Sequence, residues 1–112
     1  MAIKIVQRPA DVPGPLTLPA RVEVAQILRS SKTSEPVTIE YVLPEDSGLE
    51  FDDGETRATR DETIARADTP LRHRLQIVRA EGKGPLRVTV DEQILDSDGK
   101  VLQATSFDLF IA

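Results

Sequence analysis

Apolar and polar side chains alternate over most of this chain, and this two-residue period limits its fold more than any other feature. The clearest run extends from position 37 to 43, where the odd-numbered residues are Val37, Ile39, Tyr41 and Leu43. Successive side chains of an extended strand point to opposite faces, so the run predicts a strand with one buried side. Leu71, His73, Leu75 and Ile77 repeat the pattern.

The same period recurs at intervals of about ten residues, as in β-sandwiches. We expect an edge strand at 2–7, a short strand containing Leu49 and Phe51, and longer strands at 21–29, 37–43, 71–77, 86–95 and 101–112. Ile94 and Leu95 interrupt the alternation and predict a bulge. The last run is partly apolar on both faces, which favours a central strand.

Two segments leave alternatives open. Residues 21–29 place Val22 and Val24 against Arg21, Glu23 and Gln26 as a strand would, but a short helix could also gather the apolar residues of this segment. Residues 57–68 carry a capping-box pattern, Thr59 with Glu62, yet their one large apolar residue is Ile64. A helix, a short strand and a loop are all compatible with this second segment.

Four prolines, at positions 9, 13, 15 and 19, oppose regular pairing across the Pro-rich segment 8–20. We expect a stiff connection whose Leu16–Leu18 portion lies along a sheet edge. With no long helical period to supply crossover connections, the fold class predicted is all-β. It is an immunoglobulin-like antiparallel β-sandwich of about seven strands, forming one domain over 1–112.

Composition excludes several classes of function. The chain has no cysteine and a net charge of −5, and ten of its fourteen basic residues are arginines dispersed along the sequence. Clustered cations are what bind phosphate backbones, so a nucleic-acid partner is not expected. No run is long and apolar enough for membrane insertion or a signal peptide. The domain is therefore cytoplasmic if the chain is complete, and extracellular or on the cell surface if it is an excised module.

Three segments resemble a known family: Leu43-Pro-Glu-Asp-Ser-Gly-Leu-Glu-Phe51, the run 71–77, and Gly84-Pro-Leu-Arg-Val-Thr-Val90. Together they look like the immunoglobulin-like repeats of bacterial and archaeal surface proteins, which share turn and strand motifs with fibronectin type III domains. The resemblance covers residues 20–112, although Asp46 and Ser47 widen the corner before Gly48. It implies a sandwich that serves as a spacer or a binding module.

His73 is the only histidine, and its alternation with Leu71 and Leu75 predicts hydrogen-bonded packing and not catalysis. The acidic residues Glu45, Asp46, Glu50, Asp52, Asp53 and Glu55 could offer oxygen ligands to calcium, but their spacing matches no ion loop, so a solvated loop is expected. Asp96-Ser-Asp-Gly99 is interpreted as a hairpin turn.

Lys4 and Asp108, in the first and last predicted strands, invite comparison with the intramolecular isopeptide bonds of surface adhesins. Their positions between inward-facing Ile3 and Ile5, and between Phe107 and Leu109, turn both side chains outward. No bond is therefore expected, and no residue is assigned as catalytic, cofactor-binding or metal-binding.

These observations favour a non-enzymatic immunoglobulin-like module that acts as a spacer or binds protein or glycan within a larger surface or secreted assembly. One alternative is a small intracellular protein that pairs with a partner through an edge strand, using its first or last strand. Another is an accessory β-domain of an enzyme whose chemistry lies elsewhere in the parent chain.

Overall fold

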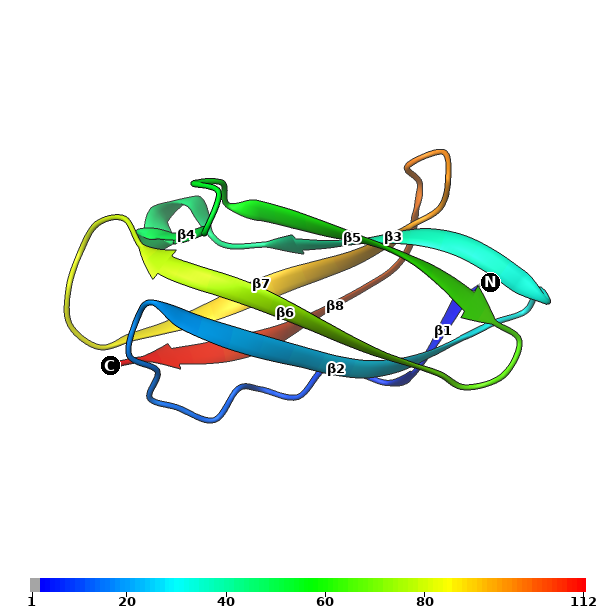
Figure 1. Cartoon of the computed structure of the whole chain (residues 1–112), viewed down its shortest axis with the longest axis horizontal. Coiled ribbons are helices and arrows are strands. Elements are labelled where there is room, and N and C mark those ends of the chain that lie inside the picture. The colour runs from blue at the N-terminus through cyan, green and yellow to red at the C-terminus, as the bar shows by residue number, and fades with distance from the viewer. Residues whose placement is uncertain (1–2) are drawn as a thin grey trace.

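Two antiparallel four-stranded sheets pack face to face in the computed structural model, which describes residues 3–112 (Figure 1). The first sheet has the order β1 (Ile3–Gln7), β2 (Ala20–Ser30), β6 (Thr69–Arg79), β4 (Leu49–Phe51). The second has the order β5 (Arg57–Ala65), β3 (Ser34–Val42), β7 (Leu86–Leu95), β8 (Val101–Ile111). The immunoglobulin-like antiparallel sandwich is confirmed, with eight strands where about seven were predicted.

The core consists of the inward-facing side chains of both sheets. Ile39 and Leu43 from the β3 segment are fully buried, as are Leu28 from β2 and Leu109 from β8. The Tyr41 and Phe107 rings meet edge to face with centroids 6.3 Å apart, a preferred aromatic geometry. The predicted parity of 37–43 is confirmed, because these odd-numbered residues form one wall of the core.

The two segments for which the sequence left a helix possible, 21–29 and 57–68, both form strands. β2 pairs with β6 from Ala20 to Leu28, and β5 pairs with β3 over its full length. A helix at 57–65 would have had only Ile64 to bury, whereas a strand gains the backbone hydrogen bonds of β3 as well. The prediction for Gln26 was wrong: it lies on the inner face with Val22 and Val24 and is buried.

The last strand is not central, contrary to prediction. β8 ends the hydrogen-bonded order of its sheet, and the Pro-rich segment lies along its outer side. The Val12 amide donates to Asp108 O at 2.9 Å, and the Leu16 amide donates to Phe110 O at 2.7 Å. Leu16 also forms a parallel bridge with Ile111. The predicted placement of Leu16 along an edge is therefore confirmed, and this segment covers an edge that would otherwise be open.

Several smaller predictions are confirmed. β1 lies at a sheet edge, although Ala2, the first residue predicted for it, is outside the described residues. The register shifts between Ile94 and Leu95, where a bulge was expected. Asp96 accepts hydrogen bonds from the amides of Asp98 and Lys100 within the predicted hairpin turn, and Gly99 there has φ +83°.

Residues 3–112 contain no helix long and apolar enough to cross a membrane.

Gly14 lies where the Pro-rich segment passes close to Phe110 of β8. A Cβ there would lie 2.6 Å from Phe110 Cβ and 2.9 Å from Phe110 O, atoms that cannot swing aside. We expect Gly14→Ala to lift the segment off β8 and to lower the free energy of unfolding by about 1–3 kcal/mol. Chemical denaturation measures this loss, with Ala10→Ser, an exposed change in the same segment, as the control. Equal stability of the two variants would contradict this packing.

Candidate functional site

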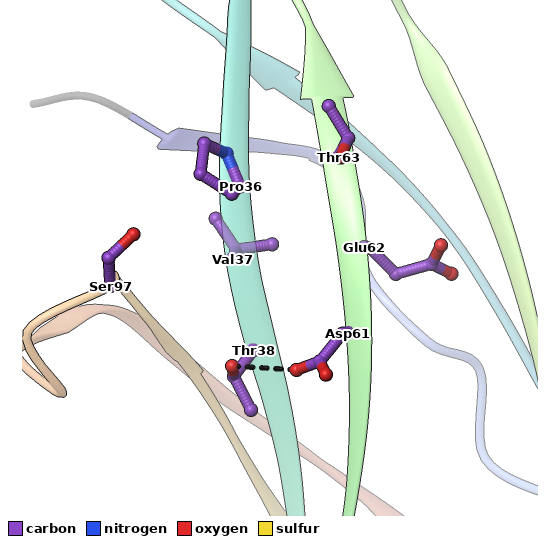
Figure 2. A pocket seen from close by; sticks show the side chains of 7 residues that line it. All are labelled: Pro36, Val37, Thr38, Asp61, Glu62, Thr63 and Ser97. Atoms are coloured by element: carbon purple, nitrogen blue, oxygen red, sulfur yellow. Dashed lines mark hydrogen bonds between the residues drawn. The ribbon is translucent and has the colours of Figure 1, made fainter.

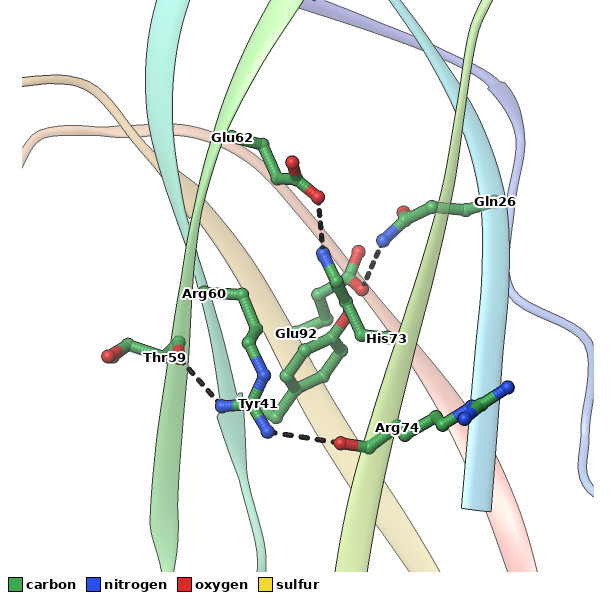
Figure 3. A network of polar contacts seen from close by, with 8 residues as sticks. All are labelled: Gln26, Tyr41, Thr59, Arg60, Glu62, His73, Arg74 and Glu92. Carbon is green, nitrogen blue, oxygen red and sulfur yellow. Dashed lines mark hydrogen bonds and ion pairs between the residues drawn. The ribbon is translucent and has the colours of Figure 1, made fainter.

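A cluster of polar side chains lies between the two sheets, among residues that are otherwise apolar (Figure 3). Its members come from five strands: Gln26 of β2, Tyr41 of β3, Glu62 of β5, His73 of β6 and Glu92 of β7. Each occupies an inward-facing position of its strand, so the alternation that builds the core also brings these groups together.

Hydrogen bonds link the cluster into a chain. The Tyr41 hydroxyl lies 2.6 Å from Nδ1 of His73, and Nε2 of His73 lies 2.7 Å from Oε2 of Glu62. With Glu62 ionised and His73 neutral, the ring proton belongs on Nε2, where it donates to Glu62. Nδ1 then accepts the proton of the Tyr41 hydroxyl. We call these three residues, together with Glu92, which lies beside the Tyr41 hydroxyl, the polar core chain.

Glu92 is the inner end of this chain and is fully buried, with 0% of its surface exposed. Nε2 of Gln26 donates to its Oε1 at 2.7 Å, while its Oε2 and the Oε1 of Gln26 have no hydrogen-bond partner among residues 3–112. Burial raises the pKa of Glu92 to about 7, and the Gln26 amide and the neighbouring Tyr41 hydroxyl, which stabilise the ionised form, offset only part of this effect. The carboxyl group is therefore suited to hold a proton near neutral pH.

Other buried glutamates differ in having a cation beside them. Lys32 Nζ lies 3.7 Å from Glu35, whose other oxygen accepts from Ser30, and Arg57 donates to Glu40 at 2.9 Å. Glu92 has no salt bridge among residues 3–112. A buried carboxylate without a cation is costly, so protonation is the cheaper state for Glu92.

Tyr41 links the two carboxyl groups and is also sealed from solvent. Its pKa is raised strongly, first because burial disfavours the phenolate and second because Glu92 lies beside it. The order hydroxyl, imidazole, carboxylate is that of nucleophile activation. However, a Tyr41 with 0% exposure cannot meet a substrate. The Tyr41 hydroxyl is therefore restricted to hydrogen bonding within the core.

The cluster approaches solvent at one side of the sandwich, which we call the open flank: β5 together with residues 70–76 of β6. The Glu62 side chain is 30% exposed there. Arg60 spans the flank, donating to Thr59 O at 2.8 Å and to Arg74 O on β6 at 3.0 Å. Because β4 pairs only with Ile77, Val78 and Arg79, no strand within residues 3–112 lies between β5 and this part of β6.

A shallow hollow of about 490 Å³ lies on the outer face beside this flank (Figure 2). Its lining comprises Pro36, Val37, Thr38, Asp61, Glu62, Thr63 and Ser97. The Thr38 hydroxyl donates to Asp61 at 2.9 Å, and in Figure 2 the Glu62 side chain points the other way, into the flank. Hydroxyl groups and one carboxylate therefore dominate the side chains of this surface.

The residues singled out from the sequence lie apart from one another. His73 faces inward and makes two hydrogen bonds, as its alternation predicted. Asp108 faces outward, bound to Arg87 and Thr89, and Lys4 is exposed. The acidic residues of 45–55 lie within β4 and in the segments that flank it along the chain. Among residues 3–112 no three acidic, histidine or cysteine side chains are grouped to hold a metal ion.

Sequence reasoning missed Glu92, Glu62 and Gln26. A signal was present for Glu92, which follows Val88 and Val90 at the inward positions of β7 and precedes Ile94. The dispersed arginines also gather in the fold. Arg21, Arg29, Arg72 and Arg74 share the outer face of β2 and β6, although Glu23 pairs with two of them and Asp68 with Arg29.

Comparison with known proteins yields structural similarity alone, since no family model and no curated protein matches. The Pseudomonas fluorescens alkylpurine DNA glycosylase AlkC, solved bound to DNA containing an abasic site analog, aligns with a TM-score of 0.58 at 17% identity. The alignment covers 96% of this chain and 30% of the glycosylase chain. A non-cellulosomal cohesin from Archaeoglobus fulgidus aligns with a TM-score of 0.43 at 11% identity, over 100% of this chain and 92% of the cohesin. The similarity to the glycosylase, at this identity, supports the fold and no more.

The burial of Glu92 makes stability depend on pH. Its pKa in the folded protein is about 7 against an ordinary 4.5, so its contribution is complete below pH 4.5 and is lost as the pH rises through 7. We expect Glu92→Gln to gain about 3 kcal/mol relative to the unmodified protein between about pH 4 and about pH 8. Urea titrations at each pH measure this, with Glu45→Gln as the exposed control. Parallel pH profiles for the unmodified protein and Glu92→Gln would contradict the assignment.

Proposed function

We propose that this domain is a non-enzymatic immunoglobulin-like module that binds a protein partner by taking an extended segment of it alongside β5. The observation that supports this most directly is the open flank. The nine-residue strand β5 has no hydrogen-bonded neighbour on one side within the described part of the chain. Free backbone groups on such an edge are the basis of β-strand addition.

The free side of β5 follows from its register. The Leu43 amide donates to Thr56 O, and β3 pairs with β5 throughout, so the even-numbered residues 56–64 bond to β3. The backbone groups of the odd-numbered residues then face outward. Two of these outward groups already have partners: Thr59 O accepts a hydrogen bond from the Arg60 guanidinium, and the Ala65 amide donates to the Thr69 hydroxyl. Asp61 and Thr63, between them, offer their amides and carbonyls to a partner.

Other edges are less suitable, including the two named from the sequence. The outer side of β8 is covered by the Pro-rich segment, β1 has five residues, and β4 has three. β5 has nine residues, enough for several paired hydrogen bonds with an added strand. The edge-strand hypothesis therefore moves from the first or last strand to β5.

The chemistry of the flank favours a partner segment with a basic side chain. Asp61 on the outer face and Glu62 on the inner face place a carboxylate on each side of the exposed backbone. An added strand alternates its side chains between the same two faces. A lysine or arginine beside Asp61 would lie over the hydroxyl-lined hollow of Figure 2 and gain a charge-assisted hydrogen bond.

The absence of catalysis is part of the proposal. Tyr41, His73 and Glu62 are the residues that most resemble catalytic machinery, and the burial of Tyr41 supports a structural or proton-holding role for them. The proposal also keeps the role expected from the sequence, a binding unit within a larger assembly.

Thr63→Pro is the sharpest test, because it removes an amide that faces outward and leaves the backbone hydrogen bonds between β5 and β3 intact. Twelve-residue peptides selected from a phage library against the domain serve as ligands. We expect them to carry a basic residue and to slow amide exchange at Asp61 and Thr63. We expect Thr63→Pro to weaken their binding at least tenfold, as measured by calorimetry.

Thr63→Ala is the matched control, since it removes the side chain but keeps the amide. It should bind the selected peptides with little loss, and circular dichroism must show that both variants are folded. Equal affinity of the proline and alanine variants, or peptide-induced protection located elsewhere, would reject β5 as the binding edge.

We also propose that the partner is not a nucleic acid, in contrast to the DNA held by the structurally similar glycosylase. The net charge of −5 and the pairing of Arg29, Arg72 and Arg74 with acidic neighbours support this. We expect no change in the fluorescence anisotropy of a labelled DNA duplex or single strand at low salt up to about 100 µM protein, the weak end of non-specific binding. Salt-sensitive binding below that concentration would contradict it.

A further inference from the structure

A series of polar groups lies between buried Glu92 and solvent. Its carboxyl group neighbours the Tyr41 hydroxyl. That hydroxyl bonds to His73, and His73 bonds to Glu62. Each member of the polar core chain comes from a different strand, and the exposed fraction rises from 0% at Glu92 and Tyr41 to 6% at His73 and 30% at Glu62.

We propose that the polar core chain is a proton-binding site that holds one exchangeable proton at Glu92 and exchanges it with water through Glu62. This inference concerns the domain by itself and does not depend on a partner at β5.

In the protonated state every hydrogen of the chain points in one direction. Oε2 of Glu92, which otherwise has no hydrogen-bond partner among residues 3–112, carries the proton and directs it toward the neighbouring Tyr41 oxygen. Tyr41 donates to Nδ1 of His73, and Nε2–H of His73 donates to ionised Glu62. The amide of Gln26 donates to the other oxygen of Glu92 at 2.7 Å. Glu62 is then the one ionised member of the chain, and it lies at the end that reaches solvent.

Release of the proton conserves charge at each intermediate residue. Glu92 passes its proton to the Tyr41 oxygen as Tyr41 passes its own to Nδ1 of His73, and Nε2 passes its proton to Glu62. Tyr41 ends as a neutral phenol and His73 as the other neutral tautomer. Glu92 becomes the carboxylate, while Glu62 becomes the acid and then loses its proton to water.

The groups that face the polar core chain favour release of the proton through Glu62. Arg60 is the cation beside it, located on the same strand as Glu62, and its charge acts on Tyr41 in the direction opposite to Glu92. From β2 the chain meets Gln26, which is neutral, and from β8 it meets Thr105, the register partner of Glu92. Of the residues facing the chain, Glu62 is the one whose carboxylate reaches the open flank (Figure 3).

The role of Tyr41 as a link distinguishes this proposal from a merely buried carboxyl group. Carbon-13 NMR of labelled glutamate side chains follows Glu92 and Glu62, and nitrogen-15 NMR follows Nδ1 and Nε2 of His73. We expect Glu92 to titrate near neutral pH, with a simultaneous change in the His73 nitrogens as the tautomer shifts.

Tyr41→Phe keeps the ring and removes the link. We expect Glu92 still to titrate above its ordinary range in this variant, while the His73 nitrogens no longer respond at the same midpoint. Glu62→Gln, at a half-buried position, serves if the phenylalanine variant does not fold, and should likewise abolish the coupled response. Glu45→Gln should leave both titrations unchanged.

Three results would overturn the proposal. The first is a Glu92 carboxyl that titrates near 4.5, the ordinary value for glutamate. The second is the lack of any response of the His73 nitrogens in the unmodified protein. The third is a His73 response that persists in Tyr41→Phe with the same midpoint, since this would show that no proton passes through the hydroxyl.

Discussion

The space between two sheets sets the main physical constraint on this domain, since every second side chain must fit there without water. Aliphatic residues fill most of it, and Tyr41 and Phe107 supply the large aromatic area. Into this space β7 directs Glu92, which forms no salt bridge within residues 3–112. The polar groups of four other strands are best understood as the response to that one carboxyl group, because an unpaired polar group in a dry core is costly.

The polar cluster also lies beside the open flank, where no strand within residues 3–112 lies between β5 and β6. β4 is only three residues long, so it leaves the edge of β6 that faces away from β2 unpaired over most of its length, beside β5. Arg60 partly compensates by bonding to backbone carbonyls of both strands. On the opposite side the Pro-rich segment performs the corresponding task for β8, where its Val12 and Leu16 amides replace those of a strand. The two edges of the second sheet therefore differ: the Pro-rich segment pairs with the backbone of β8, and the edge of β5 is open.

Much of this architecture could be predicted from the period of two, and the errors have identifiable causes. The strands at 37–43 and 71–77 have unbroken alternation, and they formed as expected. Gln26 was misjudged because polarity was taken as a sign of exposure, whereas the parity of Val22 and Val24 had already turned it inward. β8 was misjudged because apolar character on both faces can also reflect a covering segment. The cluster itself depends on register between strands distant in sequence, which alternation within one strand does not specify.

Glu62 connects the two proposals, because it belongs both to the exposed strand and to the polar core chain. A segment added along β5 would remove water from its carboxylate, and desolvation disfavours the ionised form. The bound state would then hold the proton of the chain more tightly, and by linkage the complex would weaken as the pH rises. A basic side chain beside Glu62 would act in the opposite direction by stabilising its charge. The sign of the pH dependence therefore reports which face of β5 the basic residue of the partner occupies. If that residue lies on the outer face, over Asp61, the desolvation of Glu62 dominates and the complex weakens as the pH rises.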